Sequence, residues 1–249
     1  MIKLYLPPIP SFLTDELINE LTNKFLEDNS KRVWNRSDLK NALFDLSYGK
    51  CAYSEAKLGE EGKHMEVDHF YPKSKYPQKV VEWGNLIPCI NVCNSRKRDC
   101  DPCRIPIVNP LTDDPKDYFF ILNGRIYPLS KKNEKAINTI ERCDLNNDRH
   151  FRNVRYKLEL GIKERLEDIF TIYKSDNLSG IKRLKSLMND CGRTFSYSAT
   201  KSTVILANKN FQEMRTCMLN ANQWSDEFIE LETELNFCSL PFPHTSPSQ

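Results

Sequence analysis

Glu66-Val67-Asp68-His69-Phe70-Tyr71-Pro72 opens a short span that continues through Glu82-Trp83-Gly84-Asn85-Leu86 to Cys93-Asn94-Ser95-Arg96-Lys97. An acid beside a histidine is thus followed, in order, by two asparagines. Neighbouring residues of a strand point to opposite faces, so the acid and the histidine can approach one phosphate only where the strand ends. Pro72 lies where such an ending is expected. The order predicts metal-assisted hydrolysis of a phosphodiester bond.

The chemistry of each side chain suggests its role. A neutral imidazole can take a proton from water, so His69 is the expected general base. Magnesium usually takes one or two protein oxygens, so Asp68 and Asn94 are the expected ligands of Mg²⁺ or Mn²⁺, and Asn94 thereby joins the catalytic set. Asn85 completes that set as a positioning residue, because a side-chain amide can fix a loop by bonding backbone groups.

Basic residues follow the two motifs. If the stretch that begins at Asn94 is helical, Asn94, Lys97 and Arg98 share one face, because they are spaced at i, i+3 and i+4. Lys97 and Arg98, together with Lys73, are then the expected phosphate-binding cations. The alternative is a charged face that is merely solvated.

Composition limits the class of protein. The chain has 249 residues, 39% of them hydrophobic, and a formal net charge of +2, so a nucleic-acid surface has to be a local patch. We find no export signal and no run of about 18 apolar residues, so we expect no membrane contact. Nine cysteines without a secretory context suggest a reducing compartment, and a cytoplasmic location is the expectation.

Periodicity predicts an α+β protein that is mostly helical around a central module, which carries the motifs quoted above. Helices are expected at 14–29 and 37–49, then at 136–140, 147–173, 178–191, 199–220 and 224–235. Asn123-Gly124 predicts a hairpin turn. The expected divisions are N-terminal helices at 1–49 that pack on the module, the module itself at 50–110, the hairpin and helical region at 111–240, and a flexible tail at 241–249.

At Asp68-His69, Asn85 and Asn94 the chain resembles the HNH or ββα-metal endonucleases. The pattern of that family is Asp-His at the end of a first strand, Asn in the following loop, and His or Asn on a helix. A narrower resemblance, to the PtuB family of HNH nucleases, covers residues 50–58, 67–73, 81–88 and 108–110. These nucleases accompany PtuA ATPases in Septu antiphage systems and in certain retrons. The close resemblance covers about residues 50–127.

The resemblance implies more than the residues themselves do. It implies a ββα-metal fold for the module, magnesium-dependent cleavage of DNA or RNA, and a role in antiphage defence. It also implies a PtuA-like ATPase partner of the ABC type and, in a retron, a complex of reverse transcriptase and non-coding DNA. The general base would be His69, the metal ligands Asp68 and Asn94, and the orienting residue Asn85.

The cysteines depart from the family pattern. Many HNH modules hold a structural zinc with two Cys-x-x-Cys pairs, whereas here Ser54 stands where a second cysteine would follow Cys51. The spacing leaves open an irregular zinc site drawn from Cys51, Cys89, Cys93, Cys100 and Cys103. The other interpretation is that these cysteines are small buried hydrophobic residues.

Two other functions compete with the nuclease. The first is a nucleic-acid-binding or adaptor protein with a degenerate zinc knuckle and no turnover. The second treats the helical half as a scaffold for the ATPase beside a vestigial nuclease. This type of active site reads neither sugar nor sequence by itself, so DNA and RNA both remain open as substrates.

Overall fold

The computed structural model describes residues 1–60 and 64–242, and the chain divides into two compact units. The first unit holds residue 1, residues 3–118 and residues 128–145; the second holds residue 2, residues 119–127 and the chain from residue 146 onward. Most of the expected tail lies outside the described residues. The described elements are mostly helices with two small two-stranded sheets, which confirms the α+β class. The N-terminal helices and the central module belong to the same unit.

Two helices begin the first unit, α1 (Asp15–Glu27) and α2 (Ser37–Leu46). Thr14 caps α1, because its hydroxyl oxygen accepts from the Leu17 amide at 3.3 Å. Leu21 and Phe25 of α1 are buried in a cluster that includes Val80. Gly49, three residues after α2, has a φ of +67° and tolerates the left-handed turn because it has no Cβ.

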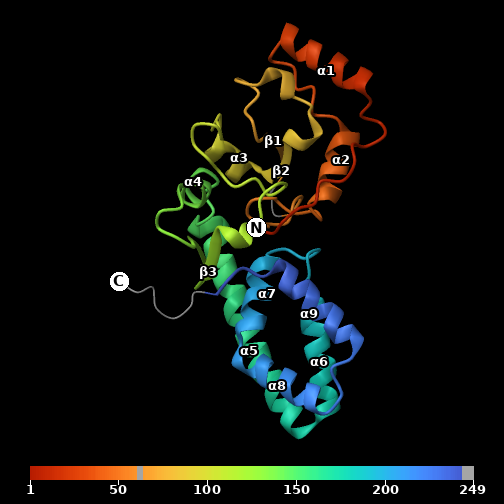
Figure 1. Cartoon of the computed structure of the whole chain (residues 1–249), viewed down its shortest axis with the longest axis vertical. Helices are drawn as coiled ribbons and strands as arrows, with labels where there is room; N and C mark the ends of the chain where they lie inside the picture. Colours follow the sequence, from red (N-terminus) through yellow and green to blue (C-terminus); the bar gives the residue numbers. More distant parts are fainter. Residues whose placement is uncertain (61–63, 243–249) are drawn as a thin grey trace. The chain divides into compact units, whose positions relative to one another are not determined.

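A small antiparallel sheet and a helix form the centre of this unit (Figure 1). Strand β1 (Met65–His69) pairs with β2 (Leu86–Ile90) so that Asp68 lies opposite Ile87. Helix α3 (Asn91–Lys97) follows β2 directly and packs against both strands. The chain from 70 to 85 connects the strands. Asp68 and His69 therefore lie at the end of β1, where the sequence predicted them.

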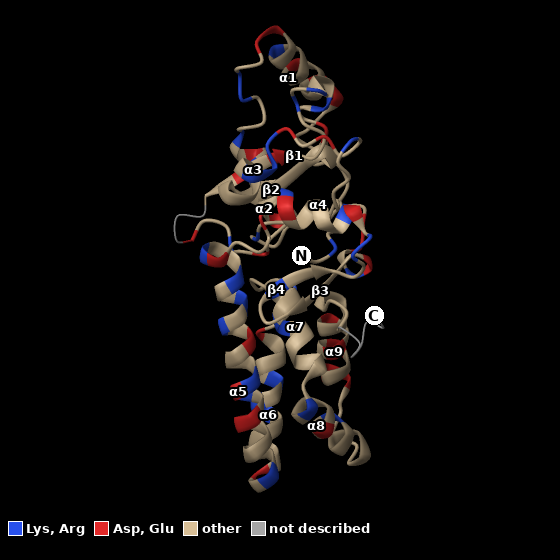
Figure 2. Ribbon diagram, turned by 90° about the vertical axis from the view of Figure 1, so that its left-hand side faces the viewer, with Lys and Arg blue, Asp and Glu red and all other residues tan. Residues whose placement is uncertain are grey.

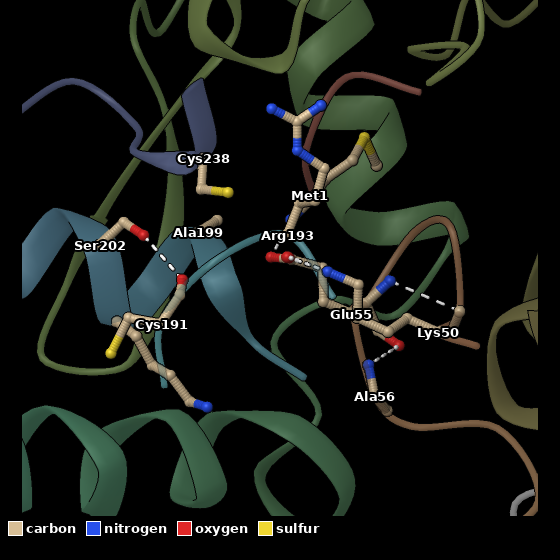
Figure 3. A network of polar contacts seen from close by, with 12 residues as sticks. Met1, Lys50, Glu55, Ala56, Cys191, Arg193, Ala199, Ser202 and Cys238 are labelled. Carbon is tan, nitrogen blue, oxygen red and sulfur yellow. Dashed lines mark hydrogen bonds and ion pairs between the residues drawn. The ribbon is translucent and has the colours of Figure 1, made fainter. Parts of the chain in front are cut away.

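Side-chain bonds hold the remaining segments of the first unit. The buried Thr139 hydroxyl of α4 (Glu134–Arg142) accepts from the Val108 amide at 2.7 Å. The buried Glu55 carboxylate accepts from Lys50 Nζ at 3.3 Å and from the amino group of Met1 at 2.8 Å (Figure 3). The bonds from Val108 to Thr139 and from Met1 to Glu55 join segments that are far apart in the sequence.

The second unit begins with the predicted hairpin. Strands β3 (Phe119–Leu122) and β4 (Arg125–Pro128) flank Asn123 and Gly124, which have φ values of +51° and +71°. Positive φ at both central residues is the requirement of a tight hairpin turn, and Asn-Gly satisfies it. The Glu159 carboxylate accepts a hydrogen bond from the Gly124 amide at 3.0 Å, and Arg155 Nε donates to the Gly124 carbonyl at 2.7 Å.

Five helices complete the second unit: α5 (Asn153–Ser175), α6 (Asn177–Asn189), α7 (Ser198–Ala207), α8 (Lys209–Asn220) and α9 (Asp226–Cys238). They share a core that includes Leu166, Leu184, Leu187, Phe211, Met214 and Leu235. The prediction of one helix over 199–220 was wrong. Asn208 is extended at that point, and its side chain accepts from the Asn210 amide at 2.8 Å to begin α8.

Charged residues of both signs occur along α5 and α6 (Figure 2). Within the part of the chain that the structure describes, no helix combines the length and the apolar character needed to cross a bilayer.

Candidate active site

A cleft of about 670 Å³ in the first unit brings several of the predicted residues to one surface. Asp68 and His69 of β1 and Asn94 of α3 all line it. Two of the three expected phosphate-binding cations, Lys73 and Arg98, also line it. Asn85 and Lys97 do not line the cleft and are buried, at 1% exposure each. The cleft thus combines a histidine, oxygen donors and cations.

His69 is held in one tautomer by the backbone. His69 is only 5% exposed, and its Nε2 is 2.9 Å from the carbonyl oxygen of Val80. A carbonyl can only accept, so Nε2 carries the hydrogen and Nδ1 carries the lone pair. Burial lowers the pKa of His69 to about 4, against the opposing effect of the Val80 bond. The imidazole is therefore neutral near pH 7, as a proton acceptor has to be.

Asn85 fixes the loop that leads to Val80. Its Oδ1 accepts from the Tyr71 amide at 2.7 Å, and its Nδ2 donates to the carbonyl oxygens of Lys79 at 2.9 Å and Tyr71 at 3.2 Å. These bonds fasten both ends of the loop between Tyr71 and Lys79. Since Val80 follows directly and accepts from His69, this geometry is the one a positioning residue requires.

Asp68 has two donors of its own. Its Oδ2 accepts from the Tyr53 hydroxyl at 2.7 Å, and its Oδ1 lies 3.0 Å from Lys97 Nζ. Lys97 Nζ also donates to the His69 carbonyl at 2.9 Å. The expectation that Lys97 binds phosphate was wrong, because its side chain is fully buried at 0% exposure. The helical spacing from Asn94 to Lys97 is real, but this face packs on β1.

Asn94 is oriented by a residue that the sequence analysis did not select. Asn94 Nδ2 donates to Glu66 Oε2 at 2.7 Å, and both residues are half-buried and line the cleft. Glu66 lies two residues before Asp68 in β1, and alternation along a strand places such residues on one face. That spacing was a usable signal for Glu66.

The donor set suits a hard cation. Carboxylate and amide oxygens are the ligands that Mg²⁺ prefers, and Glu66, Asp68 and Asn94 offer such oxygens at one cleft. An ionised carboxylate has roughly four lone-pair positions, so Asp68 retains acceptor positions beyond the two that Tyr53 and Lys97 use. The residues present therefore fit magnesium or manganese.

One wall of the cleft comes from the N-terminal helices, which the sequence analysis had not placed at the site. Arg32, Trp34 and Asn35, from the connection between α1 and α2, and Lys40 of α2 all line the cleft. The Trp34 ring packs edge-on to His69, with 4.8 Å between ring centroids and 86° between planes. Contacts over this sequence separation leave no local pattern in the sequence.

Arg98 and Lys73 lie at the cleft in different ways. Arg98 is exposed and directly follows α3 with a φ of +51°, so it leaves the helical face that it was expected to share with Asn94. Lys73 is half-buried, and its Nζ lies 5.1 Å from the Trp34 ring centroid. Both cations therefore line the cleft, but from different local structures.

The cysteines do not assemble a zinc site among the described residues. No three Cys, His, Asp or Glu side chains in residues 1–60 and 64–242 lie together as a metal-binding group. Cys51 Sγ lies 3.9 Å from Cys93 Sγ, Cys89 and Cys100 are buried, and Cys103 is exposed. Burial raises the pKa of the Cys89 and Cys93 thiols well above the usual value, which keeps them neutral.

Cys51 differs from its neighbours. Burial would raise the pKa of its thiol, but hydrogen bonds that involve Cys93 and Ser54 outweigh burial and lower that pKa to about 6. The lowered pKa favours the thiolate of Cys51 near pH 7, beside the neutral thiol of Cys93.

Comparison with known proteins gives the relationship of the whole chain. No family model matches it. Septu protein PtuB of Bacillus thuringiensis is 35% identical over 246 residues, which cover 93% of this chain and 92% of that protein. Similarity of this extent spans both structural units. The chain therefore belongs to the PtuB family of Septu proteins.

Proposed function

We propose that this chain is a magnesium-dependent HNH endonuclease that hydrolyses phosphodiester bonds in nucleic acid. The observation that carries the proposal is the bond from His69 Nε2 to the Val80 carbonyl, at a cleft that also holds Asp68 and Asn94. The order β1, β2, α3 with these residues supports a ββα-metal module.

The residues have distinct tasks in the proposed reaction. His69 Nδ1 takes a proton from the attacking water, while Nε2–H stays bonded to Val80 and stabilises the imidazolium that forms. The water oxygen bonds to phosphorus as the bond to the leaving oxygen breaks. Asp68 and Asn94 would hold magnesium or manganese, which neutralises charge on the phosphate and the leaving oxygen.

Other residues prepare this geometry. Glu66 fixes the amide of Asn94 through the 2.7 Å bond, and Asn85 fixes the loop before Val80. Lys73 and Arg98 stabilise the negative charge of the phosphate from the cleft surface. Each of these groups is in place before substrate binds, so little reorganisation is needed during the reaction.

The family supports a biological setting. Because the relative of 35% identity is a Septu protein, we propose a role in Septu antiphage defence with a PtuA-like ATPase of the ABC type as partner. Association with a retron reverse transcriptase and its non-coding DNA is a further form of the same proposal. The nucleic-acid substrate and the ATPase would both be met in the cytoplasm.

One observation favours the rival function of a nucleic-acid-binding or adaptor protein. Both oxygens of Asp68 already have donors, and one donor is the positive charge of Lys97, which opposes a second cation nearby. An adaptor would keep these contacts and bind nucleic acid without cutting it.

A cleavage assay separates the two functions. Purified protein, alone and with the ATPase partner, is incubated with single-stranded and double-stranded DNA and RNA. We expect cutting in magnesium or manganese, none in a chelator, and recovery when magnesium is returned. Binding without cutting under all of these conditions would remove the nuclease and leave the adaptor.

A further inference from the structure

The side of the cleft formed by α2 and by the connection from α1 to α2 carries positive charges that the proposed chemistry does not use. We name Arg32, Trp34, Asn35 and Lys40 the N-terminal wall; all four line the cleft that contains His69. Arg32 is exposed and Lys40 is half-buried. Neither contacts Asp68 or Asn94 in any bond that would make it part of the metal site.

The cations of the wall have no carboxylate partner. Within the described residues, Arg32 and Lys40 form no ion pair with a carboxylate. Two other cations of this unit are paired, Arg36 with Asp38 at 2.6 Å and Lys79 with Glu82 at 2.8 Å. Lys73 and Arg98, the other two expected phosphate-binding cations at the cleft, also lack a carboxylate partner among the described residues. The cleft therefore presents these cations without carboxylate partners, beside the carboxylates of Glu66, Asp68 and Asp99 that also line it.

Trp34 ties this charge to the general base. Its ring packs on His69 at 4.8 Å and on Phe25 of α1 at 6.0 Å between centroids. Phe25 is in turn buried in the cluster that contains Val80, the residue that accepts from His69. Trp34 is thus packed against the imidazole, and Arg32 and Lys40 line the same cleft as that imidazole.

We propose that the N-terminal wall binds the phosphodiester backbone of a nucleic-acid strand beside the scissile bond, with Arg32 and Lys40 each contacting one phosphate. A strand with several phosphates matches the spread of cations over the wall, Lys73 and Arg98 better than a single nucleotide does. That the bond beside this site is cleaved rests on the proposed function. Binding of the strand by the N-terminal wall can be measured without cleavage.

Salt dependence of binding tests this site. The His69→Ala protein, which we expect not to cut, is titrated with labelled single-stranded and duplex oligonucleotides of DNA and RNA at several salt concentrations. The logarithm of the binding constant falls linearly with the logarithm of the salt concentration. Each phosphate contact contributes about 0.7 to the steepness of this line for a single strand, or about 0.9 for a duplex. Adding Arg32→Ala or Lys40→Ala should lower the slope by about one such step, and Arg32→Lys should retain it.

Lys31 supplies the matched control. It is exposed, adjacent to Arg32 and absent from the cleft lining, so Lys31→Ala removes the same charge from the same segment. We expect its slope to equal that of the parent. Unchanged slopes for Arg32→Ala and Lys40→Ala, or an equal loss for Lys31→Ala, would overturn the proposal.

The outcomes separate this proposal from the endonuclease. Wild-type cleavage in magnesium together with unchanged slopes would contradict strand binding by the N-terminal wall and support the endonuclease. Binding that depends on Arg32 and Lys40 in a protein that never cuts would support the binding site and contradict the endonuclease. Absence of oligonucleotide binding in every form would contradict the binding site.

Trp34 offers an independent readout. Trp83 and Trp224 are only 3% and 8% exposed, whereas Trp34 is half-buried and lines the cleft. Oligonucleotide binding should therefore change tryptophan emission, and Trp34→Phe should abolish that change. A change that persists in Trp34→Phe would place the strand away from the wall.

Discussion

Lys97 and Asp68 form a buried ion pair between α3 and the end of β1. Nζ lies 3.0 Å from Oδ1, and the two side chains are 0% and 3% exposed. Lys97 also donates to the carbonyl of His69, so one ammonium holds both residues of the Asp-His motif. This contact fixes the helix that carries Asn94 against the strand that carries His69.

Removing the ammonium should destabilise the fold. Lys97→Met keeps the length of the side chain but leaves the Asp68 charge buried without its cation, which typically costs about 3–5 kcal/mol. Urea unfolding measures the loss. The double variant Asp68→Asn with Lys97→Met should recover part of it, because no uncompensated charge remains. A Lys97→Met protein as stable as the parent would contradict the account.

Asn85 should affect both stability and cleavage. Asn85→Ala leaves the backbone groups of Tyr71 and Lys79 without their side-chain partner, at a typical cost of about 1–3 kcal/mol. Because the loop leads to Val80, the His69 ring should also lose its fixed orientation, and cleavage at saturating substrate should fall. Gln78→Ala, an exposed change in the same loop, is the control and should alter neither quantity.

Glu66 should influence metal binding more than folding. Glu66→Ala frees the amide of Asn94 to rotate. We therefore expect the magnesium concentration needed for half-maximal cleavage to rise several-fold. Direct titration with Mn²⁺ gives a readout that does not depend on turnover. Equal metal affinity in Glu66→Ala and the parent would show that Asn94 needs no such support.

Chelation should separate catalysis from folding. Since the cysteines of the described residues form no metal group, a chelator should stop cleavage while leaving the melting temperature unchanged. Metal analysis should find much less than one zinc per chain. A zinc stoichiometry near one, with unfolding in the chelator, would restore the cysteine site as a structural element.

Much of the site could be predicted because it is local in sequence. The order of Asp68, His69 and Asn94 follows from a strand end and the helix after it, and the structure brings all three to one cleft. The Asn-Gly hairpin and the Thr14 cap follow from backbone chemistry that a few residues determine.

Other features depend on tertiary packing. Periodicity places Asn94 and Lys97 on one helical face, but only the packing of α3 on β1 decides that this face is buried. Trp34 and Arg32 reach the cleft over a long sequence separation, which no local pattern reveals. Asn208 could have been recognised as a cap that divides 199–220, since asparagine favours helix starts.

The general base is tested most directly by His69→Ala. The cleavage rate of this variant is measured with bound oligonucleotide in magnesium, beside its affinity for the same oligonucleotide and its unfolding curve. We expect cleavage to be abolished while binding and folding stay nearly intact, because the imidazole supplies the proton acceptor. Retained cutting by His69→Ala would contradict the account.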